Sequence, residues 1–164
     1  INDNGKINKA DYERRTYFLA QQRGYEIDSP EYLQIRQRIM ADWEQLSFYV
    51  DEDADGQITL TEFLAYSEYV LSDDKMWYEN SEETASFVIE VCDVDGDGSI
   101  TRDEYGVFFK SYNMTEDQIQ FAFEKLDADG DGQVTRKEIV MGLDQFGKSE
   151  NPDDAGNYIF GPLE

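Results

Sequence analysis

Apolar residues recur with helical spacing along much of the chain, and the clearest run predicts a long helix from Pro30 to Val50. Ser29 offers a side-chain acceptor to the first turn, and proline is favoured at the first helical position. The apolar positions lie three or four residues apart and form one face over about five turns. They are Tyr32, Ile35, Ile39, Trp43, Leu46 and Val50. We therefore expect this face to lie in a core.

Two capping boxes predict further helix starts. Asn80 with Glu83 forms one of them, and Thr115 with Gln118 forms the other. Apolar residues with helical spacing follow each box, namely Phe87, Val88 and Val91 after the first and Ile119, Phe123 and Leu126 after the second. The chain is therefore predicted to be all-α.

Each predicted helix leads into a twelve-residue segment, and the three segments share one pattern: DEDADGQITLTE (51–62), DVDGDGSITRDE (93–104) and DADGDGQVTRKE (127–138). Every copy has Asp at positions one, three and five, Gly at six, Ile or Val at eight, Thr at nine and Glu at twelve. This is the pattern of an EF-hand loop, which binds calcium. One D-x-D motif could be a solvated acidic turn, but three complete copies indicate metal sites.

Calcium is a hard cation that takes about six to eight oxygen ligands, so it neutralises carboxylates that would otherwise repel one another. Glycine at position six allows the sharp turn, the seventh residue offers its main-chain carbonyl, and the final glutamate closes the site. The predicted ligands of three sites are Asp51, Asp53, Asp55, Gln57, Glu62, Asp93, Asp95, Asp97, Ser99, Glu104, Asp127, Asp129, Asp131, Gln133 and Glu138. The eighth residues, Ile58, Ile100 and Val134, should pair neighbouring loops through short antiparallel strands.

Three hands leave one without a partner, and the N-terminus supplies an incomplete fourth loop. Asn2 and Asn4 take positions three and five, Gly5 position six, Ile7 position eight and Asp11 position twelve. The first ligand and the entering helix are missing, so we expect a native chain that continues N-terminally by about 11–12 residues or more. As written, this loop should be empty or weakly occupied.

The hands define a domain organisation. Residues 1–71 should form an N-terminal lobe with a truncated hand 1 and a complete hand 2, and residues 72–79 a linker. Residues 80–146 should form a C-terminal lobe with hands 3 and 4. In the tail, 147–164, the residues Tyr158, Ile159, Phe160 and Leu163 could fold back on the lobes or form a frayed terminus.

Charge and composition restrict the partners. With 14 Lys and Arg against 37 Asp and Glu, the formal charge of −23 repels nucleic acid and anionic membranes and attracts metal ions. The chain has one cysteine, no histidine and no apolar run that could span a bilayer, so we expect a cytoplasmic monomer. With its carboxylates assigned to metal and no histidine base, we expect no enzymatic activity.

One short motif suggests a different function. GLDQFGKS (142–149) matches the phosphate-binding pattern G-x-x-x-x-G-K-[ST], which requires a strand before it and a helix after it. Here the first glycine falls inside the predicted exiting helix of loop 4, Arg136 to Phe146, and Gly147 is expected as its C-cap. We therefore predict no nucleotide binding.

Calcium proteins act as buffers or as sensors that expose an apolar groove. Sensor grooves are commonly Met-rich, whereas this chain has four Met beside 11 Tyr, 10 Phe and two Trp. Bulky rings favour a closed core and therefore a buffer. A sensor that exposes an apolar surface to a target protein is the alternative.

The uneven loop spacing and the segments RDEYGVFF (102–109) and FGPL (160–163) resemble those of invertebrate sarcoplasmic calcium-binding proteins over essentially the whole chain. The resemblance implies a compact four-hand fold with its tail between the lobes, and a calcium buffer of muscle or neuronal cytosol with magnesium as a competitor. Calexcitin-like proteins, which are thought of as sensors, are similar. The related coelenterazine photoproteins use histidines that this chain lacks.

Overall fold

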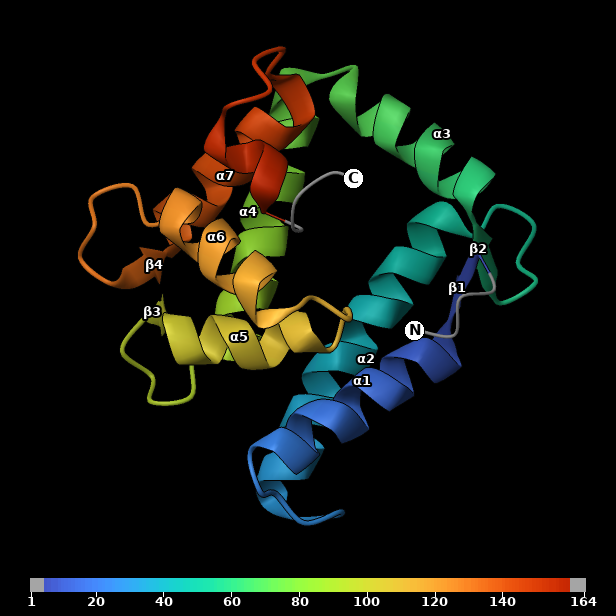
Figure 1. Ribbon diagram of the computed structural model, residues 1–164. Coiled ribbons are helices and arrows are strands. Elements are labelled where there is room, and N and C mark those ends of the chain that lie inside the picture. Colours follow the sequence, from blue (N-terminus) through green and yellow to red (C-terminus); the bar gives the residue numbers. More distant parts are fainter. Residues whose placement is uncertain (1–4, 160–164) are drawn as a thin grey trace. The chain divides into compact units, whose positions relative to one another are not determined.

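The computed structural model describes residues 5–159 and divides the chain into two compact units, Ile1–Asp73 and Asp74–Glu164 (Figure 1). In the N-terminal unit, the described residues include hand 2 and, of hand 1, the end of the loop and the exiting helix. The elements of this unit are β1 (Lys6–Asn8), α1 (Lys9–Gln22), α2 (Pro30–Val50), β2 (Gln57–Thr59) and α3 (Leu60–Leu71). Helix α1 packs along α2, and Tyr12 and Trp43 bring their ring centroids to 5.2 Å in the core between them.

The C-terminal unit contains two complete hands and a short closing turn. Its elements are α4 (Asp74–Cys92), β3 (Ser99–Thr101), α5 (Arg102–Lys110), α6 (Glu116–Leu126), β4 (Gln133–Thr135), α7 (Arg136–Lys148) and the 3-10 helix η1 (Ala155–Tyr158). Aromatic rings fill much of its core. Tyr105 stacks on Phe109 at 4.2 Å and meets Phe123 edge-on at 5.7 Å. All-α architecture with small paired strands is therefore confirmed.

The predicted strand pairing between neighbouring loops is also confirmed. β1 pairs antiparallel with β2, with Ile7 opposite Ile58, and β3 pairs antiparallel with β4, with Ile100 opposite Val134. The side chains of Ile58, Ile100 and Val134 are almost completely buried. Each pair of loops is therefore joined by backbone hydrogen bonds and anchored in the core of its own unit.

Local capping sets the starts of two helices, α2 and α6, as the sequence predicts. Ser29 accepts a hydrogen bond from the Tyr32 N–H at 3.1 Å ahead of Pro30, so α2 has its predicted bounds. Thr115 and Gln118 form the predicted capping box of α6. These short side chains satisfy N–H groups that the first turn of a helix leaves without partners.

The predicted capping box at Asn80 and Glu83 is wrong, because α4 already begins at Asp74 and contains both residues. Residues 74–79, expected in a linker, are therefore helical, and only Ser72 and Asp73 lie between α3 and α4. The physical reason is that this stretch lacks a helix breaker. Lys75 and Glu79 also form an ion pair at 3.5 Å with the spacing that stabilises a helix.

The closing turn η1 packs against α6 and α7 and brings the chain back onto the C-terminal unit (Figure 1). Ile159 is buried, and its carbonyl accepts a hydrogen bond from the Tyr105 hydroxyl at 3.1 Å. Burial raises the pKa of Tyr105, so this donor stays protonated. Phe160 and Leu163, the other apolar tail residues, lie outside the described part of the chain.

The glycines of GLDQFGKS serve helix packing. Both lie inside α7, so Gly147 is not the helix C-cap; that position belongs to Ser149. A Cβ on Gly142 would lie 2.7 Å from Leu126 Cδ2, and one on Gly147 would overlap the indole of Trp77. Lys148 pairs with Asp74 at 2.9 Å and Asp144 at 3.1 Å. The segment is therefore a tightly packed helix end.

Alanine substitutions at two glycines of the C-terminal unit should change the stability of the protein in opposite directions. In Gly156→Ala the new methyl would overlap the Gly142 carbonyl oxygen, and overpacking costs about 1–3 kcal/mol. In the control, Gly106→Ala, the methyl meets Ile119 Cγ2 at an ordinary 3.5 Å, so helix propensity should raise stability by up to about 1 kcal/mol. Thermal melts measure both, and equal shifts would contradict the packing described.

Candidate metal sites

Each of the three complete loops is folded around the first aspartate. In loop 3, Asp93 accepts hydrogen bonds from the Gly96 N–H at 2.7 Å and the Gly98 N–H at 2.9 Å. Asp127 is bound in the same way in loop 4, and Asp51 accepts from the Gly56 N–H at 2.9 Å in loop 2. The loop backbone therefore turns its N–H groups toward the carboxylates and holds them together.

The glutamate at position twelve closes each loop. In loop 2, one oxygen of Glu62 accepts from the N–H and hydroxyl of Thr59 at 2.8 and 2.7 Å, and the other accepts from the Glu52 N–H at 3.2 Å. Glu104 and Glu138 make the same three contacts in loops 3 and 4. The threonine at position nine is thus the helix N-cap, and the glutamate is both cap and candidate ligand.

In each of the three complete loops, the structure brings three carboxylates together as a group. In each group the ligand oxygens lie within 4.8 Å of one another. The groups are Asp51, Asp53 and Glu62; Asp93, Asp95 and Glu104; and Asp127, Asp129 and Asp131. Among the described residues, the other predicted carboxylates Asp55, Asp97 and Glu138 fall outside these groups, although each lies in its expected loop.

The remaining predicted ligands lie at the strand pairs. Gln57, Ser99 and Gln133 begin β2, β3 and β4, where their carbonyls were expected to serve as ligands. The Ser99 hydroxyl lies 2.6 Å from Gln133 Oε1, so a side-chain hydrogen bond also joins loops 3 and 4. In the N-terminal unit, the Lys6 ammonium donates to Gln57 Oε1 at 3.2 Å.

Hydrogen bonds keep two of these carboxyl groups ionised. The Ser99 hydroxyl and N–H lower the pKa of Asp97, and the Thr59 hydroxyl and N–H lower the pKa of Glu62. Both groups are therefore negatively charged at neutral pH. Clustered, ionised carboxylate oxygens at a sharp turn fit a hard divalent cation, and calcium accepts the irregular geometry of such a set.

Loop 2 differs from loops 3 and 4 at position four. Gly96 and Gly130 occupy this position in loops 3 and 4 with φ of 77° and 74°, whereas loop 2 has Ala54 at φ 57°. A left-handed conformation costs a residue with a Cβ about 1–2 kcal/mol. The same turn is therefore made under strain in loop 2, a difference that the shared D-x-D-x-D-G pattern conceals.

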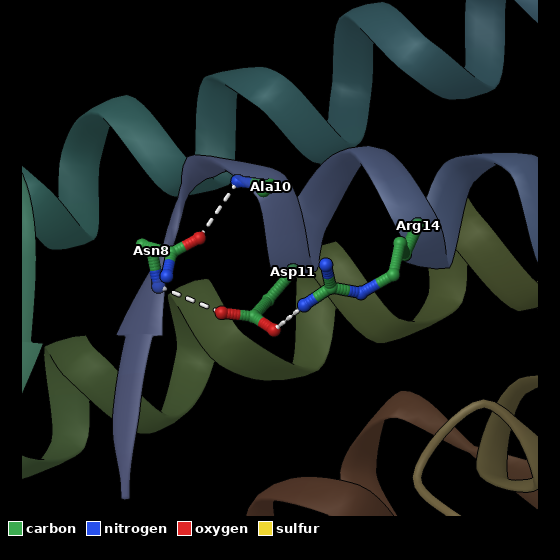
Figure 2. Close-up of polar contacts among 4 residues, drawn as sticks. All are labelled: Asn8, Ala10, Asp11 and Arg14. Atoms are coloured by element: carbon green, nitrogen blue, oxygen red, sulfur yellow. Dashed lines mark hydrogen bonds and ion pairs between the residues drawn. The ribbon is translucent and has the colours of Figure 1, made fainter. Parts of the chain in front are cut away.

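Loop 1 uses its position-twelve carboxylate in another way (Figure 2). One oxygen of Asp11 accepts from the Asn8 N–H at 3.0 Å, and the other pairs with the guanidinium of Arg14. Asn8 caps α1 by accepting from the Ala10 N–H at 2.9 Å. Asp11 is buried, and its charge is thus compensated by an arginine. Asn2 and Asn4 lie outside the described residues.

Comparison with known proteins agrees with this geometry. The family known as EF-hand domain pair matches residues 82–143, which include loops 3 and 4. The chain has the EF-hand fold. None of the curated proteins matches it in sequence. The EF-hand fold therefore supplies three candidate calcium-binding loops, at 51–62, 93–104 and 127–138.

Solved structures share the EF-hand fold over nearly the whole chain. A calcium-binding protein of Streptomyces coelicolor is 24% identical, with 96% of this chain and 89% of that chain covered and a TM-score of 0.71. The coelenterazine-binding protein of Renilla muelleri is 19% identical (99% and 88% covered, TM-score 0.81). The sarcoplasmic calcium-binding protein of amphioxus is also 19% identical (99% and 89% covered, TM-score 0.70). The expected resemblance is confirmed at the level of the fold.

One finding bears on the membrane. No helix in the described part of the chain is long and apolar enough to cross a bilayer.

Replacing Ala54 by glycine should stabilise loop 2, because glycine adopts the left-handed conformation without strain. We expect Ala54→Gly to raise the calcium-saturated free energy of unfolding by about 1 kcal/mol. Ala128→Gly in loop 4 is the matched control, since Ala128 has no positive φ and should gain nothing. Denaturant melts measure both variants, and an equal change in the two would show that Ala54 is not strained.

Proposed function

We propose that this protein binds calcium in its three complete EF-hand loops. The observation that carries the proposal is that three separate loops each hold a group of carboxylate oxygens within 4.8 Å of one another. Each ion would be held by the carboxylates at positions one, three, five and twelve and by the main-chain carbonyl at position seven. Hand 1 would take no ion, because Asp11 is bound to Asn8 and Arg14.

We further propose that the protein acts as a calcium buffer inside the cell, with magnesium as a competitor at the same loops. The packing of the C-terminal unit supports this reading, since η1 and Ile159 lie where hands 3 and 4 would otherwise expose their apolar sides. Gly156 N–H donates to Gln145 Oε1 at 2.9 Å and helps to fix this turn. The amphioxus neighbour is named a sarcoplasmic calcium-binding protein.

A calcium sensor is the second candidate, and one observation favours it. Several large apolar side chains of the N-terminal unit are exposed, among them Phe48, Leu60 and Leu64. Exposed apolar patches on soluble domains mark interaction sites. The two candidates differ in whether calcium changes the amount of exposed apolar surface.

Calcium titration tests the metal assignment. Isothermal titration calorimetry should give three ions per chain, and Glu62→Gln, Glu104→Gln and Glu138→Gln should each weaken one site by about tenfold or more, because a charged bidentate ligand is lost. Asp11→Asn should leave the stoichiometry unchanged. Glu44→Gln, on the exposed side of α2, controls for the loss of one negative charge. A fourth ion that disappears in Asp11→Asn would contradict the assignment of hand 1.

Fluorescence of a hydrophobic dye separates the two candidates. For a buffer, adding calcium in the presence of physiological magnesium should leave the dye signal unchanged or lower it, because the cores tighten around the ions. For a sensor, the signal should rise as an apolar groove opens. Gly156→Ala, which disturbs the turn over hands 3 and 4, supplies a positive control with more exposed apolar surface.

A further inference from the structure

Helix α3 presents an apolar face to solvent. Of its twelve residues, only Val70 is buried. Four large residues share one side of the helix, at positions i, i+3, i+4 and i+11 counted from Leu60, and we call them the α3 stripe. They are Leu60 (66% exposed), Phe63 (40%), Leu64 (51%) and Leu71 (38%). A surface helix normally turns such a stripe inward.

Aromatic side chains are also exposed on α2, the other helix of hand 2. Phe48 and Tyr49, at the end of α2, are 80% and 59% exposed. Tyr49 stacks on Tyr66 of α3 with ring centroids 6.3 Å apart, so the two helices are linked by this ring pair. Exposed apolar surface on both helices of one hand is typical of a site for another molecule.

The charge around the α3 stripe identifies the chemistry of that molecule. Residues 39–73 contain nine Asp and Glu and no Lys or Arg, a net charge of −9. Residues 1–38 contain seven Lys and Arg against six Asp and Glu, so the N-terminal unit concentrates its negative charge on hand 2. One calcium ion in loop 2 would leave a net charge of −7 there. An occupant must therefore be apolar on one side and positively charged around it.

We propose that the α3 stripe is the docking site of a basic amphipathic helix supplied by a partner protein. Such a helix would place apolar residues at i, i+3, i+4 and i+7 on the stripe and Lys or Arg residues beside the carboxylates of hand 2. Helix α3 has twelve residues, which corresponds to about 18 Å, or three turns, of contact.

Charge disfavours the other occupants. A second copy of the chain would bring another −23, and residues 74–164 carry 22 Asp and Glu against seven Lys and Arg. The tail after Ser149 contains Glu150, Asp153, Asp154 and Glu164 and no cationic residue. Anionic lipid and nucleic acid are repelled for the same reason. Docking goes beyond calcium storage, and it does not require that calcium opens the surface.

A synthetic peptide tests the proposal. The probe is a dye-labelled 14-residue Leu/Lys helix with leucine at i, i+3, i+4 and i+7, and its anisotropy is measured with the full chain in calcium and in chelator. We expect binding that weakens as salt is raised from 50 to 500 mM, and an affinity lower by about tenfold or more for Phe63→Gln/Leu64→Gln. Binding both in calcium and in chelator would indicate a docking site that does not depend on calcium, and binding in calcium alone would indicate a sensor. Both results support docking.

Four controls make the result specific. A Lys/Gln peptide of equal charge without leucines should not bind, and Met141→Gln/Tyr78→Gln, which alters two exposed apolar residues of the C-terminal unit outside the calcium loops, should bind within about twofold of wild type. Calorimetry should give three calcium ions for both double variants, so a failure of docking is distinguished from a failure of calcium binding. Circular dichroism should show that both variants fold.

Three outcomes would overturn the proposal. Equal affinity of wild type and Phe63→Gln/Leu64→Gln would place the peptide elsewhere. Dimerisation on sedimentation that the stripe variant abolishes would make a second copy the occupant. An absence of both peptide binding and dimerisation would mean that the stripe does not dock a basic amphipathic helix.

Discussion

The carboxylate of the glutamate at position twelve is the interaction on which each complete hand depends. In loop 3, Glu104 caps α5 through the Thr101 N–H and hydroxyl and reaches back ten residues to the Val94 N–H. One side chain therefore fixes the start of the exiting helix and the closure of the loop. The same oxygens are candidate calcium ligands, so a bound calcium ion would contact the carboxylate that fixes the start of the exiting helix. Helix geometry and metal chemistry are linked through this residue.

The two units use the same hand for different surfaces. In the C-terminal unit, η1 and Ile159 cover α6 and α7, and the glycines Gly142 and Gly156 allow the backbones to approach closely. In the N-terminal unit, α3 leaves most of its apolar residues in solvent. Tightly packed glycines and buried rings favour a unit that keeps its shape, whereas an exposed stripe favours an encounter with another molecule. Storage and docking can therefore reside in one chain.

Much of the fold and of the candidate metal sites could be predicted from the sequence, because the chemistry of an EF-hand loop is local. The apolar residue at position eight of each loop predicted the pairing of Ile100 with Val134, and Ser29 with Pro30 predicted the start of α2. The start of α4 could not be predicted from capping alone, since Asn80 resembles a cap while the preceding residues continue the helix. The strain at Ala54 and the overlap that Gly147 avoids with Trp77 depend on backbone angles and tertiary contacts. For Ala54, the sequence did contain a signal, because loops 3 and 4 have glycine at the position where loop 2 has alanine.

The ion pair of Asp11 with Arg14 has a consequence for how the hands would fill with calcium. In hand 1, the positive charge that compensates Asp11 belongs to the side chain of Arg14. The β1–β2 pairing can therefore persist at any calcium concentration. Hand 2 would then fill as an independent, single-ion event with a Hill coefficient near one. Hands 3 and 4 are joined by β3–β4 and by Ser99 and Gln133, so the first ion there would order the second loop in advance and make filling cooperative. One protein would thus combine a graded response with a steep one.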